Sequence, residues 1–313
     1  MKRQLNKVMA LAGAAILTFS LAGCSSSANE TTAATTAAAA DTEAAAADTT
    51  AEAGSEEASE EAAPADLSGS ITMAGSTSME KLANALSEVF MEKYPNVSMQ
   101  AEFTGSSAGI EALLAGQADI GNVSRELKAE ELEKGVVSNV VAIDGIAVIK
   151  DNANAVADLT KQQLTDIYTG TITNWSELGG ADAPIAVIGR DAASGTRGAF
   201  EEIVGVEDAC QYSSEYSSTG DVIGNVASNP NAIGYASLSA VEGKATVKAL
   251  TVGGVACTEA AVLDGSYEIQ RPFVLVTKQG VTLSAAAQAF FDFATSAAAS
   301  DLIKNAGAVP VAK

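Results

Sequence analysis

The 313-residue sequence contains no histidine, and this absence excludes more function classes than any other feature. The segment GSSAG matches the G-x-S-x-G pattern of the hydrolase nucleophile elbow, with Ser107 at the position of the nucleophile. A serine nucleophile of the Ser-His-Asp type needs a histidine base, so we do not expect this segment to be catalytic. Ser78 and Lys81 match the S-x-x-K pattern of penicillin-recognising enzymes, but the K-T-G partner is missing from the whole chain. We therefore expect no catalytic residue, no metal and no cofactor. A surface hydrolase that acts on phosphate esters through carboxylates and a metal stays the alternative from another class.

Basic residues are scarce: 18 Lys and Arg stand against 39 Asp and Glu, which gives a net charge of −21. We expect no nucleic-acid partner for such an acidic chain. Salt screens the overall field within about 8 Å at physiological ionic strength. Any bound anion must therefore be held by local dipoles and individual cations.

Cysteine is rare, with three residues, and no apolar run is long enough to span a bilayer comfortably. Basic residues near the start, an apolar run from 8 to 19 and the sequence LAGC are typical of a lipoprotein signal. We expect a signal peptide over 1–23, acylation (palmitate) at Cys24, and an extracytoplasmic body attached to the membrane through the lipid alone. Residues 24–66 predict a disordered acidic tether, because Ser25–Ala65 holds nine acidic residues and no Lys or Arg. Cys210 and Cys257 remain, either as a disulfide or as two buried thiols.

The rest of the chain alternates apolar strands with helices, a pattern that predicts an α/β fold with mainly parallel sheets. Val140–Ile149 is a nearly continuous apolar run, and Glu268–Lys278 reads as a second long strand; both have the length of strands that cross between lobes. We expect lobe 1 from 67–146 plus 269–313 and lobe 2 from 147–268, which together form one unit.

Three turns between a strand and a helix share one chemistry, and the most informative is GRDAASGTR, which runs from Gly189 to Arg197. Ser194 is expected to cap the following helix, whose first N–H groups are partly positive and suit an anion. Arg190 adds a planar fork of donors that matches a tetrahedral oxyanion. In the first turn, the spacing of Thr77 and Glu80 predicts a capping box with Thr77 as N-cap. The three turns predict an oxyanion site built from hydroxyls, amides and one guanidinium.

In this order, the lipoprotein box, GSTSM, GSSAG, DIGNVSREL, VVAIDGIAVI, LTDIYTGTITNW and GRDAASGTR resemble the phosphate-binding lipoproteins of phosphate ABC importers. The resemblance covers 69–313. It implies a type II periplasmic-binding-protein fold that closes on inorganic phosphate, an ABC permease as partner, and a monomer. The expected ligand-binding residues are Ser76, Thr77, Ser78, Ser106, Ser107, Arg125, Arg190, Ser194, Gly195 and Thr196.

One departure from the family concerns ligand selectivity. The resemblance implies an aspartate that accepts the proton of hydrogen phosphate in the loop that here reads SREL, and Arg125 is expected at that place. Arg125 is then either a second cation for the ligand or part of a salt bridge. A buried carboxylate at this place would repel fully ionised anions and so select hydrogen phosphate. Because no carboxylate is expected there in this chain, sulfate, tungstate and molybdate stay alternative ligands.

Overall fold

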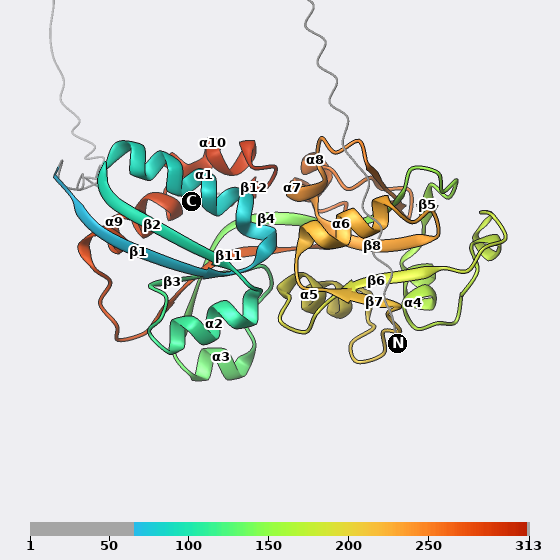
Figure 1. Cartoon of the computed structure of the whole chain (residues 1–313), viewed down its shortest axis with the longest axis horizontal. Helices are drawn as coiled ribbons and strands as arrows, with labels where there is room; N and C mark the ends of the chain where they lie inside the picture. The colour runs from blue at the N-terminus through green and yellow to red at the C-terminus, as the bar shows by residue number, and fades with distance from the viewer. Residues whose placement is uncertain (1–65, 312–313) are drawn as a thin grey trace, which may run out of the picture. The chain divides into compact units, whose positions relative to one another are not determined.

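The computed structural model describes residues 66–311, in which strands and helices alternate along the chain (Figure 1). The predicted signal peptide, Cys24 and the tether up to residue 65 lie outside the described residues. In the part described, no helix has both the length and the apolar character needed to cross a bilayer. The strands are β1 (Ser68–Gly75), β2 (Asn96–Phe103), β3 (Ile120–Val123), β4 (Val136–Asp151), β5 (Asp158–Leu159), β6 (Ala186–Arg190), β7 (Ser214–Tyr216), β8 (Ala232–Ser237), β9 (Val247–Ala249), β10 (Thr251–Val252), β11 (Gln270–Lys278) and β12 (Val309–Pro310). The helices are η1 (Thr77–Met79), α1 (Glu80–Lys93), α2 (Ser106–Leu114), α3 (Ala129–Glu133), α4 (Lys161–Tyr168), η2 (Trp175–Leu178), α5 (Gly195–Val204), α6 (Thr219–Ala227), α7 (Leu238–Val241), α8 (Glu259–Leu263), α9 (Ala285–Thr295), η3 (Ala297–Ala299) and α10 (Ser300–Asn305).

The main sheet runs in the order β2-β1-β3-β11-β4-β8-β6-β7, with β9 and β12 paired to β4. The outer strands pair in parallel: β1 with β2 and β3, and β6 with β7 and β8. The pairs that involve β4 and β11 are antiparallel, because the chain leaves along β4 and returns along β11. The predicted α/β class is confirmed, and its parallel pairing holds outside the crossing strands.

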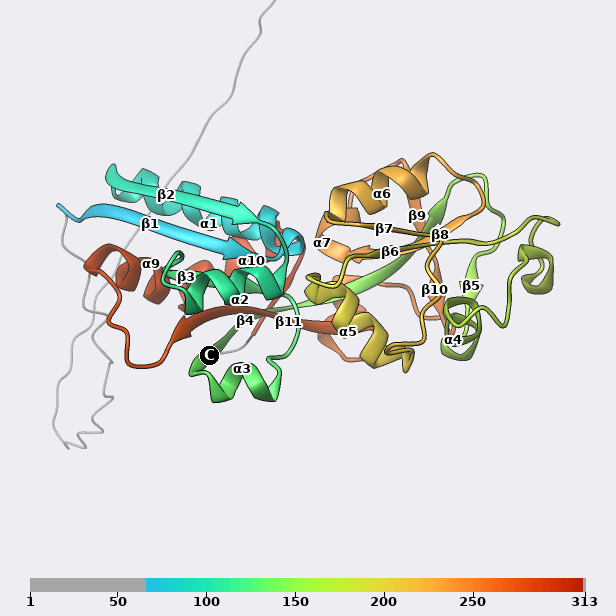
Figure 2. The same cartoon turned by 60° about the horizontal axis from the view of Figure 1, so that its bottom comes forward.

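Two hydrophobic cores lie toward opposite ends of β4, which contributes side chains to both, and β11 runs beside the first part of β4 (Figures 1 and 2). One core joins β1, β2 and α1 to α9 and α10, and a smaller cluster with Ile110 and Val274 lies beside it. The other core gathers β6, β8, α5 and α6 and contains the buried hydrophobic side chains from Ile146 to Ile269. We call the groups around these cores the first and the second lobe. The predicted lobe boundaries stay a prediction, and the division between the cores falls close to them, except that Val309 packs into the second core.

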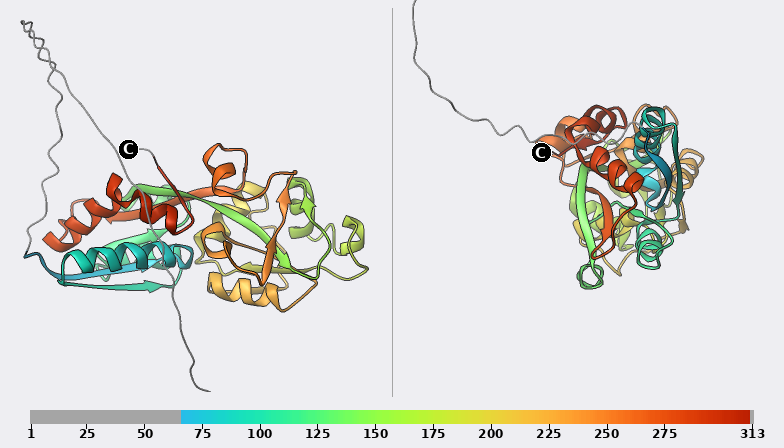
Figure 3. Two further views of the ribbon diagram at one scale, coloured as in Figure 1. Left: turned by 90° about the horizontal axis from the view of Figure 1, so that it is seen from above. Right: turned by 90° about the vertical axis from the view of Figure 1, so that its left-hand side faces the viewer.

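The last helices of the chain return to the first lobe, where α9 and α10 pack beside α1 (Figure 3). Phe90 of α1 and Phe290 of α9 meet edge to face with ring centroids 5.3 Å apart. Burial of aromatic pairs of this kind is among the larger contributions to core stability. The β1–α1 unit that carries the first predicted turn therefore rests on the C-terminal segment.

The strand and helix ends near the turns explain how the site residues are placed. Ser194 caps α5 as predicted, since its Oγ accepts from the N–H of Arg197 at 3.2 Å. The prediction for Thr77 was wrong: Ser76 caps η1 by accepting from the N–H of Ser78. A 3₁₀ turn precedes α1 and moves the helix start to Glu80, so the Thr77 hydroxyl is available for contacts outside its own helix.

Candidate anion-binding site

The turns after β1 and β6 meet at the junction of the two lobes, together with the start of α6. The hydroxyls of Ser78 and Thr196 are 2.7 Å apart, and those of Thr77 and Thr219 are 2.9 Å apart. Each pair joins the first lobe to the second. Thr219 also donates its backbone N–H to Thr77 Oγ1 at 3.2 Å. The N-termini of η1, α5 and α6 are thereby directed at a common region, as an anion site requires.

The turn after β2 joins this region through the loop that follows β3. Ser76 Oγ donates to Ser124 Oγ at 2.8 Å, and Ser124 Oγ lies 3.3 Å from Ser106 Oγ. A Cβ built on Gly195 would lie 2.8 Å from Ser124 Oγ and closer still to Ser106 Oγ. Only glycine fits there while the lobes are together. We call the buried hydroxyl residues Ser76, Thr77, Ser78, Ser106, Ser124, Thr196 and Thr219 the hydroxyl cluster.

Arg190 is 2% exposed at the end of β6 and faces the hydroxyl cluster. Its Nη1 donates to Thr219 Oγ1 at 3.1 Å, while Nε and Nη2 donate to the carbonyls of Tyr216 and Ser217. Burial lowers the pKa of Arg190 from its ordinary value, and the charge of Arg271 acts in the same direction. The neighbouring Asp191 accepts from the N–H of Ala193 and is part of the turn. Arg190 thus enters the site without a hydrogen-bonded carboxylate among the residues that the structure describes.

A second arginine beside the hydroxyl cluster was not predicted from the sequence. Arg271 of β11 donates Nη2 to Thr196 Oγ1 at 3.2 Å and Nε to the Ser124 carbonyl at 3.1 Å. Its Nη1 forms an ion pair with Asp144 of β4, the residue directly opposite in the strand register. A partial signal was available, because Asp144 interrupts the apolar run of one crossing strand and Arg271, of opposite charge, directly precedes the apolar run of the other.

Arg125 and Ser107 lie to one side of the hydroxyl cluster. The Arg125 guanidinium makes a bidentate ion pair with Glu131, at 2.7 and 2.8 Å, and its Nη2 is 3.3 Å from Ser107 Oγ. Burial raises the pKa of Glu131, but hydrogen bonds from Arg125 and the Lys128 N–H outweigh it, so the pKa is below its ordinary value. The geometry favours the salt bridge over the ligand role for Arg125. In its loop, Ser124 is the side chain that enters the cluster.

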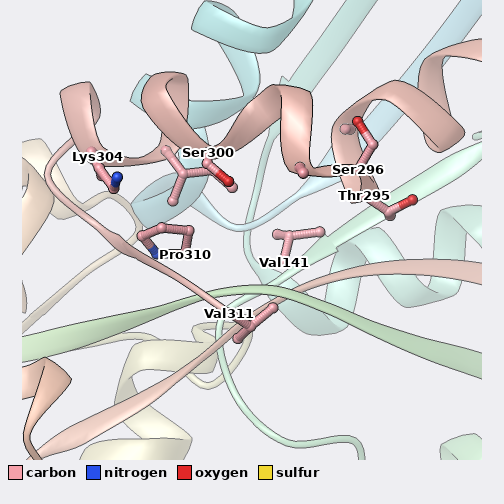
Figure 4. Close-up of a pocket in the computed structure, with 10 residues that line it drawn as sticks. Val141, Thr295, Ser296, Ser300, Lys304, Pro310 and Val311 are labelled. Carbon is pink, nitrogen blue, oxygen red and sulfur yellow. The ribbon is translucent and has the colours of Figure 1, made fainter. Parts of the chain in front are cut away.

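Of two cavities in the described residues, one borders the hydroxyl cluster and the other does not. A cavity of about 410 Å³ opens beside the hydroxyl cluster, with Thr77, Ser78 and Thr219 in its wall together with Lys81 and Glu242. The other, of about 280 Å³, lies between β4, α10 and the C-terminal strand and contains no predicted site residue (Figure 4). Residues 66–311 contain no group of three or more acidic or cysteine side chains placed to hold a metal.

The two lobes, the crossing strands and a polar junction between them define a ligand-binding receptor of the periplasmic-binding-protein class. The model of a PBP superfamily domain (PBP_like_2) matches residues 26–298. The phosphate-binding protein PstS of Bacillus subtilis (strain 168) is 36% identical over 208 residues, which cover 64% of this chain and 68% of that protein.

Solved structures agree with this similarity. A putative phosphate ABC transporter substrate-binding protein with bound phosphate, from Clostridium perfringens, is 42% identical with a TM-score of 0.74, over 78% of this chain and 100% of the other. An ABC-type phosphate transport receptor from Vibrio cholerae is 32% identical with a TM-score of 0.65, over 77% of this chain and 100% of the other. The chain belongs to the PBP superfamily and, within it, to the family of PstS-like phosphate-binding proteins.

Proposed function

We propose that the protein captures inorganic phosphate between its two lobes and delivers it to an ABC importer. The observation that carries this proposal is the buried charge at the lobe junction. Each buried carboxylate of the described residues has an arginine partner: Glu131 with Arg125, Glu201 with Arg197, and Asp144 with Arg271. Arg190 has hydroxyl and carbonyl partners instead.

A buried, unpaired cation is costly, and a bound anion offsets that cost. The groups around Arg190 are suited to such an anion. Gly195 and Thr196 open α5, where N–H groups lack helical partners. The hydroxyls of Thr77, Ser78 and Thr219 are close enough to one another to converge on one small ion. We propose that Ser76, Ser106 and Ser194 shape and cap the same turns, and that Arg125 and Ser107 support the wall.

The wider setting belongs to the same proposal. Acylation at Cys24 would hold the protein on the outer face of the membrane, and the acidic tether would let the body reach the importer. The body acts as a monomeric receptor and performs no reaction on its ligand. The names of the relatives from Bacillus subtilis and Clostridium perfringens, a phosphate-binding protein and a substrate-binding protein, support this reading.

Titration calorimetry with phosphate tests the proposal. We expect Arg190→Ala to weaken phosphate binding by about tenfold or more, because several charge-assisted hydrogen bonds depend on that guanidinium. Lys161→Ala is the matched control, since it removes one positive charge from an exposed side chain. Equal affinity in the wild type and Arg190→Ala would remove Arg190 from the site. Sulfate, tungstate and molybdate titrations test the alternative ligands, and a chromogenic phosphate ester with and without chelator tests the hydrolase alternative.

A further inference from the structure

The Arg271–Asp144 ion pair is a buried charged unit at the centre of the lobe junction. Arg271 is 3% exposed and Asp144 is 1% exposed. The Asp144 carboxylate also accepts from Ser237 Oγ at 2.8 Å and from the Ser239 N–H at 3.1 Å. Asp144 is therefore held by groups of the second lobe on one side and by the guanidinium of Arg271 on the other.

The hydrogen bonds of Arg271 leave part of its fork directed at the hydroxyl cluster. A guanidinium has five N–H donors. Within 66–311, the Arg271 side chain donates to the carbonyls of Ser124 and Asp144, to the Asp144 carboxylate and to Thr196 Oγ1. Nη2 thus keeps one N–H beyond its bond to Thr196. That atom lies next to a predicted ligand hydroxyl, at the start of α5.

The charges at the junction support a role in anion binding. Arg190 and Arg271 are both buried and like-charged, and the field of Arg271 reaches Arg190. With Asp144 as the single carboxylate partner, these three side chains carry one net positive charge. An anion between the two guanidinium groups would relieve their repulsion.

Resting on the proposed function, we propose that Arg271 is a second guanidinium of the phosphate site and that Asp144 is its positioning residue. The site then holds its oxyanion with Arg190 from the second lobe and Arg271 from a crossing strand. Because Arg271 bonds to Ser124 of the first lobe and Thr196 of the second, it also couples ligand binding to the meeting of the lobes.

The test compares the wild type with the double variant Asp144→Asn/Arg271→Gln, which removes both charges and leaves the net charge unchanged. We expect phosphate affinity to fall by about tenfold or more, with the thermal unfolding of the variant monitored in parallel. The matched control is Asp301→Asn/Lys304→Gln, an exposed ion pair on α10, which should leave affinity unchanged. Wild-type affinity in a folded double variant would overturn the proposal.

The two single variants separate contact from positioning. If Asp144 acts through Arg271, Asp144→Asn weakens binding severalfold in the wild type and has no effect in the Arg271→Gln background. Equal losses in both backgrounds would refute the positioning role. Should Arg271→Gln not fold, Arg271→Lys replaces it, and an affinity between those of the wild type and the double variant is expected. A wild type that binds no phosphate would instead defeat the proposed function itself.

Discussion

Gly195→Ala perturbs the meeting of the two lobes more directly than the removal of any ligand group. The added Cβ would lie 2.8 Å from Ser124 Oγ and closer to Ser106 Oγ, and both serines are fully buried and bonded to each other. Overpacking of this kind costs about 1–3 kcal/mol. Since 1.4 kcal/mol is tenfold in affinity, phosphate binding should weaken by about 5- to 150-fold.

The penalty applies only while the lobes are together, because Gly195 belongs to the second lobe and both serines to the first. The free energy of unfolding should therefore stay unchanged or rise by about 0.5–1 kcal/mol, as alanine replaces glycine in the first turn of α5. Calorimetry gives the affinity, and denaturant unfolding gives the stability. Gly224→Ala in α6 is the control, because a Cβ there meets open space. Undiminished phosphate affinity in Gly195→Ala would refute the close approach of the two lobes in the bound form.

Three further predictions concern charge and reactivity. Glu131→Gln should lower the free energy of unfolding by about 3 kcal/mol at pH 7, because it leaves Arg125 buried without its carboxylate. Because the pKa of Glu131 is depressed in the folded protein, its ionised form stabilises the fold above the ordinary pKa of 4.5, and this stability is lost as the pH falls through the folded pKa. The difference in free energy of unfolding between variant and wild type should therefore narrow below pH 4.5. A difference in urea unfolding that stays constant with pH would contradict this. Burial raises the pKa of Cys257 to about 12 and that of Cys210 to about 11. Alkylation at pH 8, followed by mass spectrometry, should therefore be slow at both thiols in the native protein and fast in denaturant. Rapid labelling of Cys257 in the native protein would disprove its burial. Added inert salt should speed phosphate association, because it screens a chain of net charge −21, and stopped-flow rates that fall with salt would show a long-range positive field instead.

The regular elements followed from hydrophobic pattern and turn chemistry. The run Val140–Ile149 predicted a crossing strand because it is nearly continuously apolar, and in the structure the four side chains from Ile146 to Ile149 are fully buried. β4 is longer than predicted, since both of its ends pair with neighbouring strands, although Val137 and Ser138 at its start are exposed. Cysteine pairing was left open by the sequence, and both cysteines of the described residues are free thiols.

The role of a site residue could be predicted where it depends on neighbours in the sequence, and could not where it depends on a contact with a distant segment. Ser194 caps its own helix, so the sequence around it was sufficient. Thr77 fits a capping box just as well, yet it opens the 3₁₀ turn before α1, and its contact with Thr219, 142 residues away, determines its role. Thr219 lies in a polar stretch with no pattern of its own. Its importance arises only when the lobes are brought together.

Arg190 is held in place by hydrogen bonds, so this acidic protein can offer an anion a fixed local positive charge. Its backbone N–H donates to Tyr235 Oη at 3.2 Å, and its carbonyl accepts from Arg197 Nη1 at 2.9 Å. The side chain is fixed in turn by carbonyls of the segment before α6. The guanidinium is therefore placed by second-lobe contacts alone, and little rearrangement is needed when a ligand arrives. Selectivity then falls to the groups that the first lobe adds, Ser78 and Ser124 among them, because they complete the site only when the lobes meet.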